Sequence, residues 1–117
     1  MTRARGIFTN LAVPDVEEAK GFYTDFLGLS EVEFDLGWVA RCTSPDTGVS
    51  VQLVSGDATA PEDSAATVMV DDLEEALAEA ERRGYEIVHP LTTEPWGVTR
   101  FFVRAPDGNV LNVVAQH

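Results

Sequence analysis

Few side chains in this sequence could act as metal ligands, nucleophiles or general bases. Histidine occurs twice, as His89 and His117, and cysteine once, as Cys42. His89 precedes Pro90, so we expect it in a loop, and we expect His117 to be frayed. Cys42 lies within an expected strand and is interpreted as a buried structural thiol. No Ser-His-Asp or Cys-His arrangement is recognisable, so we assign no catalytic residue.

Paired carboxylates are the other candidates for acid–base chemistry. Asp15 precedes Glu18 by three residues, and the same spacing recurs at Asp72 and Glu75. An Asp that caps a helix, followed by Glu at the third helical position, forms a capping box. Because capping accounts for both pairs, we do not interpret them as a general acid and base.

The two capping boxes belong to a longer internal repeat. The segment 13–19 recurs as 70–76, a shift of 57 residues, and the segment 44–54 resembles 105–114. The simplest explanation of these repeated segments is that one supersecondary unit occurs twice in the chain. The chain is accordingly read as one domain over residues 1–117, with repeat unit 1 at about 6–54, a polar linker at 55–64 and repeat unit 2 at about 65–115.

Hydrophobic periodicity predicts the same order of elements in each unit, namely a strand, a helix and three strands. The expected helices are 15–27 and 71–83. The expected strands are 6–13, 31–35, 38–43 and 49–54 in the first unit, and 85–88, 99–104 and 109–115 among those of the second. On the first helix we expect an apolar stripe of Ala19, Phe22, Tyr23, Phe26 and Leu27. The fold class is therefore α+β, with two βαβββ units whose curved mixed sheets surround a cavity.

Composition excludes several classes of protein. The 117 residues carry 8 basic and 20 acidic side chains, a net charge of −12, which argues against nucleic-acid binding. Ten of those acids lie in the two expected helices, so we interpret them as solvated helix faces. No apolar run is long enough to cross a membrane, and the single cysteine is typical of a cytoplasmic protein.

The repeated pattern resembles a known superfamily. The residues that carry the likeness are Leu11-x-Val13-x-Asp15, Phe22-Tyr23 with Leu27-Gly28-Leu29, Val70-Asp71-Asp72, and the stretch from Phe101 to Asn109. They resemble the vicinal oxygen chelate superfamily, which includes glyoxalase I, extradiol dioxygenases, and fosfomycin- and bleomycin-resistance proteins. The resemblance implies the paired βαβββ fold but no single activity, because one fold hosts several chemistries.

The resemblance also implies four metal-ligand positions. On the first strand of each half, where relatives usually have His, this sequence has Phe8 and Ala65. On the last strand of each half, where relatives usually have Glu, it has Gln52 and Asn112. Phenyl and methyl groups donate nothing to a metal, and neutral amides are weak ligands alone. We therefore expect no metal and no cofactor.

Strand alternation predicts which side chains line the cavity. Phe101 and Val103 are expected to face the helix, which directs Arg100, Phe102 and Arg104 to the opposite face. Extended to the other strands, this projection gives the expected ligand-binding set: Phe8, Asn10, Arg41, Gln52, Met69, Trp96, Arg100, Phe102 and Asn112. Trp96 is either a wall of the cavity or a packing anchor, and the other aromatic residues either bind ligand or simply fill space.

These residues favour a metal-free protein that sequesters a small organic molecule or antibiotic, as bleomycin-resistance-type proteins do. The charged residues projected inward are Arg41, Arg100 and Arg104, so a neutral or anionic planar ligand is expected. The alternative is a divergent glyoxalase- or dioxygenase-like enzyme that uses other ligands, such as Glu94 with Gln52. A sensor module is a third possibility. We also expect a homodimer, supported by apolar strand residues at Val49, Val51 and Leu53.

Overall fold

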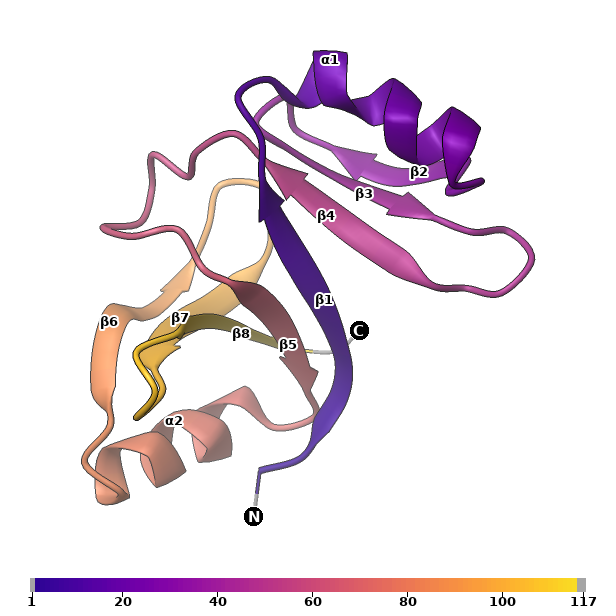
Figure 1. The fold of residues 1–117 in the computed structure, drawn as a ribbon. Helices are drawn as coiled ribbons and strands as arrows, with labels where there is room; N and C mark the ends of the chain where they lie inside the picture. Colours follow the sequence, from indigo (N-terminus) through magenta and orange to yellow (C-terminus); the bar gives the residue numbers. More distant parts are fainter. Residues whose placement is uncertain (1, 116–117) are drawn as a thin grey trace. The chain divides into compact units, whose positions relative to one another are not determined.

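The computed structural model describes residues 2–115, so His117 lies outside the described residues. The chain divides into two compact units, one of residues 8–59 and one of residues 1–7 with 60–117. We call them the first and the second unit (Figure 1). No helix within residues 2–115 is long and apolar enough to span a membrane.

The first unit contains four strands and one helix that ends in a π-turn. Its sheet has the order β2-β3-β4-β1, in which β1 and β4 are parallel and the other neighbours are antiparallel. The elements are β1 (Ala4–Ala12, which belongs to this unit from residue 8), α1 (Val16–Gly21), the π-turn η1 (Phe22–Phe26), β2 (Glu31–Asp35), β3 (Val39–Thr43) and β4 (Ser50–Val54).

The second unit repeats this topology. Its sheet has the order β5-β8-β7-β6, again with the first pair parallel and the others antiparallel. The elements are β5 (Ala66–Val70), α2 (Leu73–Arg82), β6 (Glu86–Thr93), β7 (Thr99–Arg104) and β8 (Val110–Ala115). The α+β class with two βαβββ units is therefore confirmed.

The capping aspartates begin both helices as the sequence predicts. Asp15 accepts a hydrogen bond from the backbone N–H of Glu18 at 3.1 Å, and Asp72 accepts one from Glu75 at 3.0 Å. Each bond satisfies an N–H group that the helix itself cannot pair. Both aspartates therefore have a structural role as helix caps.

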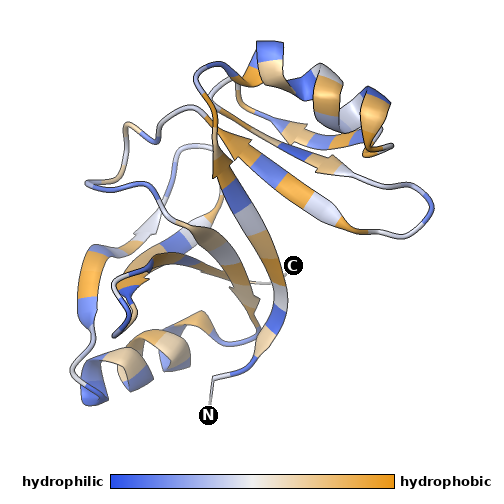
Figure 2. Ribbon diagram, in the orientation of Figure 1, coloured by the Kyte–Doolittle hydropathy of each residue, from blue (hydrophilic) through white to orange (hydrophobic). Residues whose placement is uncertain are grey.

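Each helix packs on one face of the sheet of its own unit. In the first unit Val16 packs with Ala40 and Leu53, and in the second Ala76 packs with Phe101 and Val113. Hydrophobic and hydrophilic residues alternate along most of β4 (Figure 2), as expected for a strand with one face on a core. We call the face opposite the helix the open face of each sheet.

The apolar stripe predicted on the first helix is wrong at three of its five positions. Phe22, Phe26 and Leu27 are 57%, 75% and 49% exposed, whereas Ala19 and Tyr23 pack on the core. The reason is the π-turn, in which Leu27 N–H donates to Phe22 O at 3.3 Å, five residues back. The wider turn rotates the side chains that follow away from the α-helical stripe.

The predicted loop around His89 is also wrong. β6 continues to Thr93, and His89 is a buried residue within it. Pro90 is tolerated there because β6 is the last strand of its sheet and its register with β7 shifts between His89 and Thr92. Pro90 led to the prediction of a loop, but the chain forms an irregular edge strand at this place.

Candidate ligand-binding clusters

A row of hydrogen-bonded side chains crosses the open face of the first unit. Asn10, Gln52 and Arg41 are neighbours in register on β1, β4 and β3. Gln52 Nε2 donates to Asn10 Oδ1 at 2.8 Å. Arg41 Nε and Nη2 donate to Gln52 Oε1 at 3.1 and 3.0 Å. The structure thus brings together three residues that the sequence placed in the ligand-binding set.

Two aromatic rings flank the guanidinium of this row. The Arg41 guanidinium carbon lies 4.1 Å from the centre of the Phe8 ring and 5.6 Å from that of Phe34. Both distances allow cation–π attraction. Phe34 is a residue that the sequence analysis missed, because a register shift between Val32 and Phe34 sets Phe34 opposite Arg41. We call Phe8, Asn10, Phe34, Arg41 and Gln52 the Arg41 cluster.

The charge of Arg41 is not matched by an ion pair within the described residues. Burial lowers the pKa of the Arg41 guanidinium, and the charge of Glu33 acts in the opposite direction. Glu33 itself accepts a hydrogen bond from the hydroxyl of Thr43. Among residues 2–115, Arg41 forms no ion pair within 4 Å. A partly desolvated cation without an ion-pair partner is a natural place for an anion.

The second unit holds a different cluster, in which a carboxylate is the centre. Glu94 Oε2 accepts a hydrogen bond from Arg100 Nε at 2.7 Å and lies 3.2 Å from His89 Nε2. The Arg100 guanidinium lies over the ring of Phe102 at 4.8 Å, and the rings of His89 and Phe102 are 5.3 Å apart. All four residues are at least nine-tenths buried. With Trp96 they make up what we call the Glu94 cluster.

Trp96 lies in the tight turn between β6 and β7. Gly97 N–H donates to Glu94 O at 2.9 Å, which closes the turn, and Gly97 has φ 96°, a value that favours glycine. The turn sets the Trp96 ring 5.2 Å from the Arg100 guanidinium. Trp96 is thus joined to the Glu94 cluster through Arg100.

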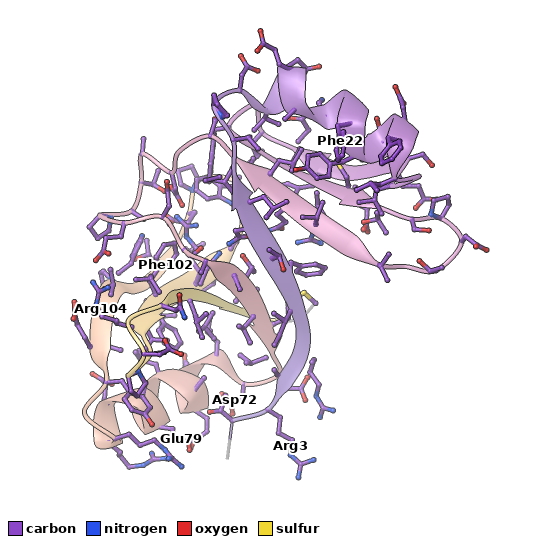
Figure 3. The ribbon with its side chains drawn as sticks, in the orientation of Figure 1. Arg3, Phe22, Asp72, Glu79, Phe102 and Arg104 are labelled. Carbon is purple, nitrogen blue, oxygen red and sulfur yellow. The ribbon has the colours of Figure 1, made fainter. Side chains whose placement is uncertain are left out.

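The arginines projected inward differ in how their charge is balanced. Arg100 is neutralised by Glu94, whose carboxylate the sequence analysis did not place on the sheet. Arg104, the last residue of β7 (labelled in Figure 3), pairs with Glu62 and with Glu86. Acids outside the helices thus pair with both of these arginines. Arg41 alone of the three lacks such a partner within residues 2–115.

The other predicted residues of the second unit lie on β5 and β8. Asn112 Nδ2 donates to Thr67 Oγ1 at 3.3 Å, while Asn112 Oδ1 is buried without a hydrogen-bond partner in the described residues. A buried acceptor of this kind is costly unless a ligand or water supplies a donor. Met69 lies near β1, where a Cβ at Gly6 would be 3.7 Å from Met69 Cε.

A family model matches nearly this whole arrangement of strands and helices. The model of the Glyoxalase/Bleomycin resistance protein/Dioxygenase superfamily matches residues 7–113. The chain belongs to this superfamily. The resemblance inferred from the sequence motifs is confirmed. None of the curated protein sequences compared with the chain matches it.

Solved structures support the same fold. A superfamily member from Vibrio splendidus 12B01 is 23% identical, with a TM-score of 0.65, and the match covers 99% of this chain and 100% of that one. Methylmalonyl-CoA epimerase from Mycobacterium tuberculosis is 18% identical with a TM-score of 0.70, and the match covers 97% of this chain and 89% of that one. NAD-dependent benzaldehyde dehydrogenase from Legionella pneumophila is 15% identical with a TM-score of 0.76, and the match covers 96% of this chain and 100% of that one. These identities establish the fold and no activity.

The metal-ligand positions of the superfamily do not suit a cation in this chain. Phe8 and Ala65 provide no donor atom, and Gln52 Oε1 already accepts two hydrogen bonds from a guanidinium. A positive charge therefore stands beside the one oxygen that the first half offers, and it would repel a metal ion. Within residues 2–115 no group of three or more His, Cys, Asp or Glu side chains could hold a metal. The donor set does not fit the superfamily's metal.

Glu94 is the carboxylate that a divergent enzyme would need as a ligand or base. Its Oε2 atom is engaged by Arg100 and lies beside His89. The oxygen that would bind a metal or accept a proton is therefore already in contact with two side chains. The geometry of Glu94 thus favours a structural role.

Proposed function

We propose that this superfamily member is a metal-free binding protein that sequesters an anionic planar organic molecule, with Arg41 pairing its negative group. The observation that carries the proposal is the Arg41 guanidinium, stacked 4.1 Å from Phe8 and without a carboxylate partner in residues 2–115. An anion there would supply the charge that burial makes costly to leave unpaired.

The chemistry of the cluster favours a carboxylate on an aromatic or conjugated ring. A guanidinium is planar and presents five N–H donors, of which Gln52 takes two. The others suit the two oxygens of a carboxylate, whose hydrogen bonds with arginine are short and strong. The rings of Phe8 and Phe34 provide apolar surface for a planar ligand, and Asn10 and Gln52 provide polar atoms beside it.

A thermal-shift screen tests this proposal. Three panels of planar aromatic compounds would be compared, one of carboxylates, one of neutral molecules and one of cations, each with and without divalent metals. We expect carboxylates to raise the midpoint of unfolding without added metal, because a ligand that binds only the folded state stabilises it. Stabilisation by cations alone, or only with metal, would contradict the proposal.

Arg41→Met provides the decisive variant and Arg104→Gln its control. Both remove one positive charge, but Arg104 is paired with Glu62 and Glu86 and belongs to neither cluster. We expect Arg41→Met to lose the carboxylate-dependent shift and Arg104→Gln to retain it. An equal loss in both variants would mean that only net charge matters.

We also propose that the protein forms a homodimer and acts in the cytoplasm. Val51 and Leu53 pack in the core of the first unit, so they do not supply the apolar surface that the sequence suggested. The support is instead the exposed pair Phe22 and Phe26, whose rings lie 5.2 Å apart. Light scattering at micromolar concentration should give the mass of two chains, and Phe26→Ser should reduce it. A monomeric wild type would contradict the dimer.

A further inference from the structure

A cavity lies within the second unit, on the helix side of its sheet. It has a volume of about 350 Å³ between α2 and the sheet, is open to solvent on one side, and has Thr2 and Ala4 in its wall. An apolar cavity of about 150 Å³ is enough to bind benzene. The sheet lines this cavity with apolar side chains: Val68, Val70, Phe101, Val103, Leu111 and Val113.

The repeat explains why the cavity exists. At the shift of 57 residues that relates the two helices, Ala19 corresponds to Ala76, and Tyr23 corresponds to Ala80. Tyr23 packs on the core of the first unit, whereas Ala80 lines the cavity of the second. A methyl group thus stands on α2 where α1 carries a phenol ring. The absence of this ring accounts for part of the empty volume.

Polar residues at the cavity are already paired with one another. Glu79, labelled on α2 in Figure 3, accepts hydrogen bonds at 2.8 Å from both the N–H and the hydroxyl of Thr2. Its other oxygen accepts one from Arg83 Nε at 3.0 Å. Hydrogen bonds from Thr2 and Arg83 lower the pKa of Glu79 to about 2, so the pair with Arg83 persists at neutral pH. A charged ligand would find no unpaired counter-charge in this pair.

We propose that this cavity binds a neutral single-ring aromatic compound, such as a phenol or an alkylbenzene, at the position that the Tyr23 ring occupies in the first unit. The apolar walls favour a ring, and the balanced Glu79–Arg83 pair disfavours a net charge on it. Thr2 lines the same cavity, and its Oγ1 atom, whose hydrogen is donated to Glu79, can accept a hydrogen bond from a phenolic hydroxyl. This site is separate from the Arg41 cluster and does not depend on the function proposed above.

Phenol is the probe that tests this site. In a titration followed by NMR, we expect saturable binding to the wild type, with contacts from the phenol ring to the methyl groups of Val68 and Leu111. Benzoate should give no such contacts. Absence of saturation, or contacts only with other residues, would overturn the proposal.

Ala80→Phe fills the cavity from within and should weaken phenol binding by about tenfold or more. Ala78→Phe adds the same ring to α2 at a residue outside the cavity lining and should leave the affinity unchanged. Ala80→Leu, a smaller change, should give an intermediate loss if Ala80→Phe does not fold. Arg41→Met should bind phenol as the wild type does. Binding that is insensitive to both Ala80 variants would contradict the site.

Discussion

Arg41 and Gln52 lie opposite each other on β3 and β4, and the guanidinium donates two hydrogen bonds to one amide oxygen. At the corresponding place in the second unit, Phe102 lies opposite Asn112 on β7 and β8. The two halves of the repeat have thus kept an amide at the last-strand position and differ in its neighbour. In the first unit the neighbour of the amide is the cation Arg41. This positive charge explains why the position suits an anion better than a metal ion.

Gln52→Glu should weaken the binding of an anionic ligand by about tenfold or more. A carboxylate at this position would accept the hydrogen bonds of Arg41 as a charged partner and satisfy the cation internally. The affinity would be measured by calorimetry with the best carboxylate from the thermal-shift screen.

Val49→Glu is the matched control for this change, since it adds the same negative charge at a residue that is 60% exposed. It should leave the affinity close to that of the wild type. If Gln52→Glu binds the carboxylate as tightly as Val49→Glu does, Arg41 is not the group that pairs with the ligand.

Glu94→Gln should destabilise the fold by about 3–5 kcal/mol, because it leaves the charge of Arg100 buried without its carboxylate. Arg100 is only 3% exposed. The free energy of unfolding would be measured with urea. Glu62→Gln removes a partner of the more exposed Arg104 and should cost less than about 1 kcal/mol. Similar costs for the two variants would show that the Glu94 pair is solvated.

Leu53→Ala should lower the free energy of unfolding by about 2–5 kcal/mol, because Leu53 is fully buried beneath α1. Val49→Ala, nearby in the chain but largely exposed, should change it by about 0.5 kcal/mol or less. Urea unfolding of both variants tests whether the core beneath α1 includes Leu53 and leaves out Val49, which precedes β4. A larger cost for Val49→Ala would contradict this burial.

Glu79 should make stability depend on pH in acid. Its pKa is lowered from 4.5 to about 2 in the folded protein, chiefly by hydrogen bonds from Thr2. A carboxyl whose folded pKa is lowered stabilises the fold above its unfolded pKa and loses that effect as the pH falls to the folded value. Glu79→Gln should therefore lower the melting temperature at pH 6 and have little effect near pH 2. A difference independent of pH would contradict this prediction.

Sequence periodicity was sufficient to predict the paired topology because the repeat supplies two copies of each signal. Asp15 and Asp72 both cap helices, and Phe101 and Val103 face the helix as alternation requires. Alternation also placed Asn10, Gln52 and Arg41 on one face, and in the structure they are neighbours in register. Local patterns therefore sufficed wherever the backbone is regular.

Irregular backbone accounts for what could not be predicted. The π-turn exposes Phe22 and Phe26, and the shifted register of β6 buries His89 beside Glu94. A register shift likewise sets Phe34 opposite Arg41. Each of these features depends on one backbone group bonding to an unexpected partner. Hydrophobic periodicity carries no signal for such a choice.

Elemental analysis tests the central claim most directly. The protein would be produced in medium supplemented with manganese, iron, nickel and zinc, dialysed, and analysed together with its Arg41→Met variant. The account predicts no stoichiometric metal in the wild type, because Phe8, Ala65, Gln52 and Asn112 do not form a suitable donor set. One divalent ion per chain that resists dialysis would contradict it.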